Sequence, residues 1–247
     1  MFGSATQVGL TQALDLMAKP LPQLAASALG FYASVAFAAP PKQFPIFDRE
    51  SAKPILVVAT VRPGKYLPEF AECSNPDTIC MDPPPFWFSA RVKSVVHGTK
   101  TPSRLDVATT SHYGMSELEL LGSQPLLLSL LTDGSEFVMP RYAMAALTED
   151  KQGNLHVLVI RPQPIWWLPC SVTELRQEIS PDDFPGDIEI PMDEAEIYTK
   201  ESPELFRVTA TGATPIYAIP VSRIGAHLDS LAPTGSQMAC EMGGSSQ

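Results

Sequence analysis

The stretch Phe86–His97 reads FWFSARVKSVVH, and it alternates between apolar and polar residues. One face of an extended chain would carry the mostly apolar set Phe86, Phe88, Ala90, Val92 and Val96. The other face would carry the mainly polar set Trp87, Ser89, Arg91, Lys93 and His97. A spacing of two is the signature of a half-buried β-strand, so we predict a strand whose apolar face lies in a core.

Further strand-like segments surround this stretch. They are rich in β-branched or apolar residues, and prolines, glycines or Asn/Asp turns separate them: Ile55–Val61, Leu105–Tyr113, Pro125–Leu131, Glu136–Met139, Arg141–Leu147 and Leu155–Ile160. Asp133-Gly134 predicts one hairpin turn, and the polar residues 148–154 predict another. Pro125–Leu131 (PLLLSLL) is a nearly continuous apolar run, which is typical of a central strand.

Only Val172–Ile179 resembles a helix, with Ser171 as its cap and Glu174 at the capping-box position. The 25 prolines among 247 residues agree with short elements, because an interior proline costs a helix roughly 3 kcal/mol. We therefore expect a mainly all-β fold: a small barrel or sandwich over residues 54–180 with one short C-terminal helix.

The N-terminus has the pattern of a secretory signal peptide. An uncharged, mostly apolar stretch lies between Lys19 and Lys42, and it ends in the small-x-small sequence Ala36-Phe37-Ala38. We predict a signal segment at 1–38, with translation starting either at Met1 or at Met17. The alternative is an uncleaved anchor, since about 20 apolar residues can span a bilayer.

The four cysteines agree with export to an oxidising compartment, either the periplasm or the outside of the cell. They are Cys73, Cys80, Cys170 and Cys240. Their even number suggests two disulfides, most simply Cys73–Cys80 and Cys170–Cys240. A zinc site is less expected, because six residues separate the first two cysteines and no histidine is near.

The net charge of −10 is concentrated in one segment. Eleven acids and two cations between Glu174 and Glu204 contribute −9. We expect an extended acidic connector at 181–204, after a Pro-rich lead-in at 39–53. An additional strand pair or flap would occupy 205–231, and a flexible tail 232–247. The acids of the connector could bind calcium, but they lack the spacing of an EF-hand loop.

The segment FWFSARVKSVVHGTKTPSRLDVATTS resembles exported bacterial proteins with an OB-like barrel, similar to the barrel of tissue inhibitors of metalloproteinases and netrin modules. This resemblance covers about residues 54–180 and implies an OB-like barrel and an inhibitor-like binding role. The N-terminal Cys-x-Cys with which the animal inhibitors reach the protease metal is not present in this sequence.

No motif of a lipase-type hydrolase, zinc protease, P-loop or dinucleotide fold occurs, so we predict no enzyme activity, cofactor or metal. The histidines are dispersed: His97, His112, His156 and His227. The alternative is a hydrolase or metal-dependent enzyme without a recognisable motif. A pocket lined by His97 or His112, with a carboxylate in hydrogen-bond reach, would favour that alternative.

The candidate binding surface is Trp87 with Arg91 and Lys93, on the outward face of the alternating strand. An aromatic ring beside cations suits a glycan or protein partner. The alternative is that Trp87, Trp166 and Trp167 cap the barrel. We expect no nucleic-acid partner, because such proteins carry a basic footprint. A membrane contact is expected only if the N-terminal segment stays uncleaved, in which case the protein would be a structural envelope component.

Overall fold

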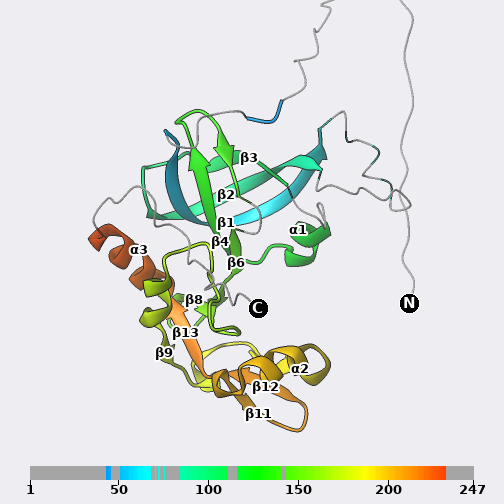
Figure 1. Ribbon diagram of the computed structural model, residues 1–247, viewed down its shortest axis with the longest axis vertical. Helices are drawn as coiled ribbons and strands as arrows, with labels where there is room; N and C mark the ends of the chain where they lie inside the picture. The colour runs from blue at the N-terminus through cyan, green and yellow to red at the C-terminus, as the bar shows by residue number, and fades with distance from the viewer. Residues whose placement is uncertain are drawn as a thin grey trace, which may run out of the picture. The chain divides into compact units, whose positions relative to one another are not determined.

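The alternating stretch forms strand β2 (Pro85–His97) of the computed structural model, between β1 (Lys53–Tyr66) and β3 (Arg104–Thr110) (Figure 1). Both neighbours pair with β2 in antiparallel register. Phe86, Phe88 and Ala90 are each only 1% exposed, whereas Trp87 is half-buried and Ser89 and Arg91 are exposed. The predicted strand is therefore confirmed, and its predicted core face is fully buried only over residues 86–90, since Val92 and Val96 are half-buried.

The structure describes residues 43–45, 51–67, 70, 72, 75, 84–110, 116–140 and 143–231. These residues belong to one compact unit, 40–247. The predicted signal segment 1–38, the tail 232–247 and most of the lead-in 39–53 lie outside the described residues. In the part that is described, no helix is long and apolar enough to cross a membrane.

Five strands close into a barrel in the order β1-β2-β3-β5-β4, because β1 also pairs with β4. The closing strands are β4 (Leu126–Thr132) and the short β5 (Phe137–Val138), which pairs parallel to β3. Helix α1 (Ser116–Leu121) precedes β4, and β6 (Met144–Ala146) extends the sheet beyond it. This is the strand arrangement of an OB-like barrel, and the predicted all-β class is confirmed. The barrel sheet ends at Ala146, so it is shorter than the expected range 54–180.

The turn at Asp133-Gly134 joins β4 to β5 as predicted. The side chain of Asp133 organises it by accepting hydrogen bonds from the backbone amides of Ser135 (2.8 Å) and Glu136 (3.0 Å). Such an Asx-type turn explains why this dipeptide ends one strand and starts the next.

The apolar runs in β1 and β4 are buried on both faces. Residues 55–59 and 126–130 are all buried, although alternate side chains of a strand point to opposite sides. Only one side of these strands faces the barrel interior. The other side is covered by residues that follow the barrel, and the hydrophobic core includes Val157, Trp167, Leu168, Ile224 and Leu228.

The residues after the barrel form two further sheets. One has the order β7-β8-β13-β9, and its strands are Thr148–Glu149, Leu155–Leu158, Tyr217–Pro220 and Gln177–Glu178. The other has the order β10-β12-β11, with strands Ile190–Pro191, Gly212–Pro215 and Phe206–Val208. Residues 205–220 therefore add strands to these two sheets and do not join the barrel.

The helical expectations were wrong in two places. The expected helix at 172–179 is a 3-10 helix, η2 (Cys170–Leu175), which ends before strand β9 and is not capped by Ser171. The expected extended connector at 181–204 contains helix α2 (Met192–Glu201), flanked by the 3-10 turns η3 (Pro181–Asp183) and η4 (Pro203–Leu205). A third helix, α3 (Val221–Ser230), follows β13 and packs against β2.

Candidate binding face and pocket

The outward side of β1, β2 and β3 carries a group of cations arranged in rows. Directly paired residues of a sheet share a face, so the register defines each row. Thr60, Arg91 and Arg104 form one row across the three strands, and Arg62, Ser89 and Asp106 form the next. A third row pairs Lys65 with Trp87. We call the exposed residues Arg62, Lys65, Ser89, Arg91, Arg104 and Asp106 the basic face.

None of Arg62, Lys65, Arg91 and Arg104 forms an ion pair with any residue that the structure describes. The one acid of the basic face, Asp106, accepts a hydrogen bond from the Ser89 hydroxyl at 3.4 Å. Guanidinium and ammonium groups in this state are available to an anionic partner.

The structure brings only part of the predicted patch together. Trp87 and Arg91 share the outward side of β2, but four residues along a strand separate them by about 13 Å. Trp87 is half-buried, and Lys93 is exposed. Lys93 lies at a β-bulge, because Val58 pairs with Ser94 while Ala59 pairs with Val92. Lys93 thus has no direct partner on β1, and the bulge takes it out of the regular rows.

A second bulge fixes the row that contains Trp87. The register of β1 against β2 shifts between Pro63 and Lys65, which leaves Gly64 as the extra residue. A Cβ atom on Gly64 would lie 1.9 Å from the carbonyl oxygen of Trp87, so only glycine permits this approach of the two backbones. Gly64 is therefore the residue that lets Lys65 stand beside Trp87.

Of the two adjacent tryptophans Trp166 and Trp167, one is exposed and the other is buried, as expected for neighbouring residues. Trp166 is 42% exposed and Trp167 is 7% exposed, and Trp167 belongs to the hydrophobic core. Trp167 therefore helps to fill the core, while Trp166 leaves an aromatic face in solvent. Neither lies on the strands of the basic face, so they are not part of that surface.

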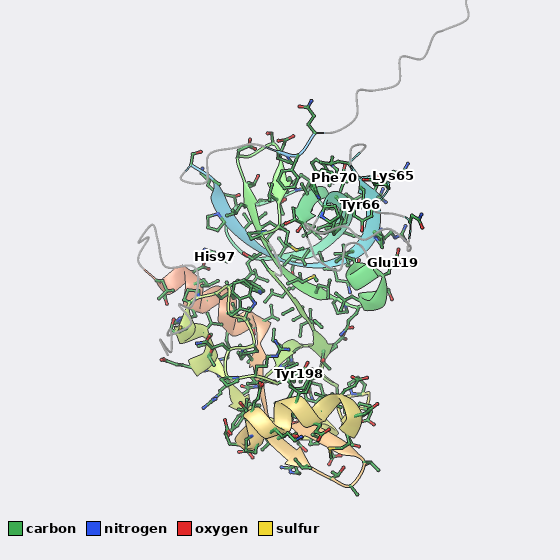
Figure 2. All side chains as sticks on the ribbon, turned by 45° about the vertical axis from the view of Figure 1, so that its right-hand side comes forward. Lys65, Tyr66, Phe70, His97, Glu119 and Tyr198 are labelled. Atoms are coloured by element: carbon green, nitrogen blue, oxygen red, sulfur yellow. The ribbon has the colours of Figure 1, made fainter. Side chains whose placement is uncertain are left out.

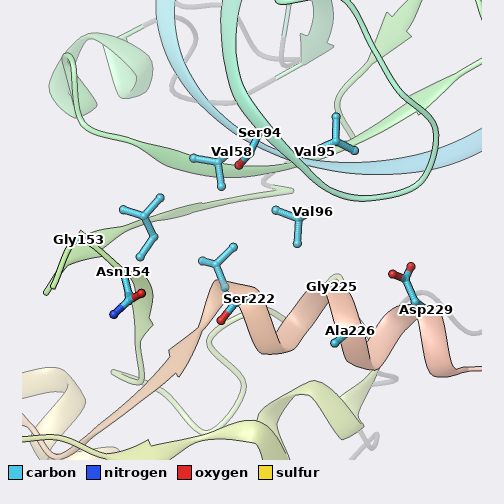
Figure 3. A pocket seen from close by; sticks show the side chains of 12 residues that line it. Val58, Ser94, Val95, Val96, Gly153, Asn154, Ser222, Gly225, Ala226 and Asp229 are labelled. Atoms are coloured by element: carbon cyan, nitrogen blue, oxygen red, sulfur yellow. The ribbon is translucent and has the colours of Figure 1, made fainter.

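A pocket of about 460 Å³ lies between the end of β2, the turn before β8 and helix α3 (Figure 3). Its apolar wall comes mainly from the valines of β2 and from Leu155 and Val221. Polar groups of Ser94, Asn154, Ser222 and Asp229 also line it. Polar and apolar surface contribute about equally to its lining, and its volume falls within the range of small-molecule sites.

His97 joins the barrel to α3 at this pocket. Its Nδ1 lies 2.6 Å from a carboxylate oxygen of Asp229, which is one of the residues that line the pocket. Figure 2 shows His97 beside α3, away from Lys65 at the other end of the β1–β2 pair. His97 is thus half-buried and paired with a carboxylate.

Two more histidines make contacts that sequence patterns do not reveal. His156 is buried, and its Nε2 lies 2.9 Å from Asp150, which also accepts hydrogen bonds from the amides of Gln152 and Asn154. His227 of α3 lies 2.8 Å from the hydroxyl of Ser171 in η2. The first contact ties the turn before β8 to that strand, and the second ties η2 to α3. Asp150 lies in a turn-rich stretch, and Ser171 is far from His227 in the sequence.

Of the four cysteines, Cys170 lies in the described part of the chain, where no thiol is free. Cys73, Cys80 and Cys240 lie outside the described residues, so both predicted pairings stay predictions. Within the described ranges, no three His, Cys, Asp or Glu side chains gather closely enough to hold a metal ion.

No protein-family model, curated protein or solved structure matches this chain. The assignment of an OB-like barrel therefore rests on the strand order and register alone.

Proposed function

We propose that the protein is an exported, non-enzymatic binding module whose basic face recognises a protein or glycan partner. The observation that carries this proposal is the presence of four exposed cations without a described ion-pair partner on one side of a rigid barrel. Charged groups on such a face steer the approach of an anionic partner and fix its register. Trp87, beside Lys65, adds a flat apolar surface at one end.

The remaining support for export comes from the sequence. The signal-like segment 1–38 and the even number of cysteines both favour a periplasmic or secreted protein. The resemblance to the barrel of metalloproteinase inhibitors and netrin modules agrees with a binding role, and an inhibitor-like activity belongs to this proposal. Sequencing of the mature N-terminus tests export: a start at Ala39 is expected, and an intact N-terminus would favour a membrane-anchored envelope protein.

The binding surface is tested by affinity capture from periplasmic or secreted extract. We expect the Trp87→Ala/Arg91→Ala double variant to lose most of the partner that the unaltered protein captures. Arg207→Ala is the control, because Arg207 is also exposed but lies on β11 in another sheet. Equal recovery by the double variant and the control would rule out this surface.

A second candidate function is a hydrolase, and the pairing of His97 with Asp229 favours it. A carboxylate bound to Nδ1 leaves Nε2 as the basic nitrogen, which is how an aspartate orients a histidine for general-base catalysis. Cleavage of p-nitrophenyl acetate by the whole chain, with His97→Gln as the test and His227→Gln as the control, decides this candidate. A rate that falls only in His97→Gln would support it, and identical rates in both variants would reject it.

A further inference from the structure

We propose that Arg91 and Arg104 together clamp one oxyanion, and that the ligand is an acidic polysaccharide carrying carboxylate or sulfate groups. This inference rests on the proposed function, because it names the ligand class of the same face. Arg91 on β2 and Arg104 on β3 are directly opposite each other, and both are exposed.

Directly opposite residues on one face of a sheet have Cβ atoms about 5 Å apart, and like charges in such positions destabilise the pair. Neither arginine forms an ion pair with a described residue. A carboxylate or sulfate group between them would replace the repulsion with charge-assisted hydrogen bonds from two guanidinium groups. The pair is thus unfavourable in the free protein and favourable with an anion.

The other cations indicate a polymer and not a single small anion. Arg62 lies in the next row, about 7 Å along the strands from the row of Arg91, and Lys65 lies beyond it. Successive cations at this spacing suit a chain with repeated negative groups. A single small anion would engage only the clamp and would leave Arg62 and Lys65 unused.

The polar residues in the centre of the face favour a polysaccharide over an acidic polypeptide. Ser89 and Asp106 lie between the cations and form a hydroxyl–carboxylate pair. A carboxylate at this position repels a partner that offers only negative charge, but it can accept further hydrogen bonds from hydroxyl groups. Sugars supply hydroxyl donors together with apolar ring faces, and an aromatic side chain such as Trp87 can contact those faces.

The test measures binding of the full chain to immobilised alginate and dextran sulfate, with neutral dextran and poly-L-glutamate as comparison ligands. The variant is Arg104→Glu, which places a carboxylate opposite Arg91. Arg207→Glu is the control, because it changes the net charge by the same amount on a different sheet.

We expect Arg104→Glu to weaken binding to at least one acidic polysaccharide about tenfold or more, and Arg207→Glu to have a much smaller effect. We also expect Arg104→Glu to raise the thermal midpoint by roughly 1–3 °C, since it removes the cross-strand repulsion. This combination separates loss of a ligand contact from loss of folding.

Equal weakening by both variants would overturn the clamp, because it would show only an effect of net charge. Equally tight binding of poly-L-glutamate would overturn the polysaccharide as the ligand class. If polysaccharides do not bind while Trp87→Ala/Arg91→Ala still loses its captured partner, this inference fails and the proposed binding face stands.

Discussion

Gly225 of α3 lies directly against the backbone carbonyl of Val96 in β2. A Cβ atom at position 225 would be 2.4 Å from that oxygen and 3.3 Å from a methyl carbon of Val96. Helix α3 thus approaches the barrel strand as closely as it does because residue 225 has no side chain. The same approach forms one wall of the pocket, which both residues line (Figure 3).

We expect Gly225→Ala to destabilise the protein by about 1–3 kcal/mol, the usual cost of forcing extra atoms into a filled interior. In an unconstrained helix the same change would stabilise by up to about 1 kcal/mol, so the expected sign is the opposite of helix propensity. Urea unfolding measures the difference. Ser222→Ala, at an exposed position of the same helix, is the control and should be nearly neutral. A Gly225→Ala protein that is as stable as the unaltered chain would contradict the close contact.

The barrel strands could be predicted because their signals are local. Alternation in 86–97 and the nearly continuous apolar run at 125–131 each report directly on which faces are buried, and both segments form strands of the barrel. The turn at Asp133-Gly134 is equally local. What these signals could not supply was the partner of each strand, since register depends on segments far apart in the chain.

The helices were missed for a different reason. The acidic segment 181–204 is expected to be extended, yet its prolines Pro191 and Pro203 only flank α2, which begins after the first and ends before the second. Proline is tolerated at the start of a helix, so its presence marks an end as readily as a break. In α3 the buried residues Val221, Ile224, Gly225 and Leu228 have helical spacing, a signal that could have identified it.

The basic face was predicted only in part, because it is assembled across three strands. Arg91 was identified on its own strand, but Arg62, Lys65 and Arg104 join it through the register of β1 and β3. The bulge at Lys93 has a different effect, because it takes this exposed residue out of the regular rows. Neither effect is visible in the periodicity of a single segment.

The adjacent tryptophans make a matched pair for mutation. Trp167→Ala should destabilise the protein by about 3–5 kcal/mol, because it empties a core position that is 7% exposed. Trp166→Ala should change the free energy of unfolding by no more than about 1 kcal/mol, because Trp166 is 42% exposed. Chemical denaturation followed by circular dichroism compares them. Similar losses in both variants would show that Trp166 also packs in a core.

The turn that precedes β8 should make stability sensitive to acid. Burial raises the pKa of Asp150, but hydrogen bonds from Asn154 and His156 outweigh it and hold that pKa well below its ordinary value. A carboxyl whose pKa is lowered by folding contributes stability above its unfolded pKa, and the contribution is lost as the pH falls towards the folded pKa.

We therefore expect the unaltered protein to be more stable than Asp150→Asn near neutral pH, and the difference to shrink as the pH falls below about 4. Urea unfolding at a series of pH values measures this difference. Glu149→Gln is the control, since it removes a neighbouring charge without removing these hydrogen bonds. A difference that stays constant across the acid range would contradict the assignment.

The arrangement of η2 and α3 supports one pairing of the cysteines. Ser171, next to Cys170, bonds to His227 in α3, so the chain that leaves α3 at Ser230 starts near Cys170. Only nine residues separate Ser230 from Cys240. We expect peptide mapping under non-reducing conditions to find Cys170 joined to Cys240.

The same pairing predicts how much each disulfide stabilises the protein. In the chain-entropy model, closing the long loop from Cys170 to Cys240 contributes roughly 4 kcal/mol, against roughly 2–3 kcal/mol for the short loop between Cys73 and Cys80. Cys170→Ser should therefore destabilise the protein more than Cys73→Ser does. A peptide that joins Cys170 to Cys73 or Cys80 would refute this pairing, whatever the stability of the variants.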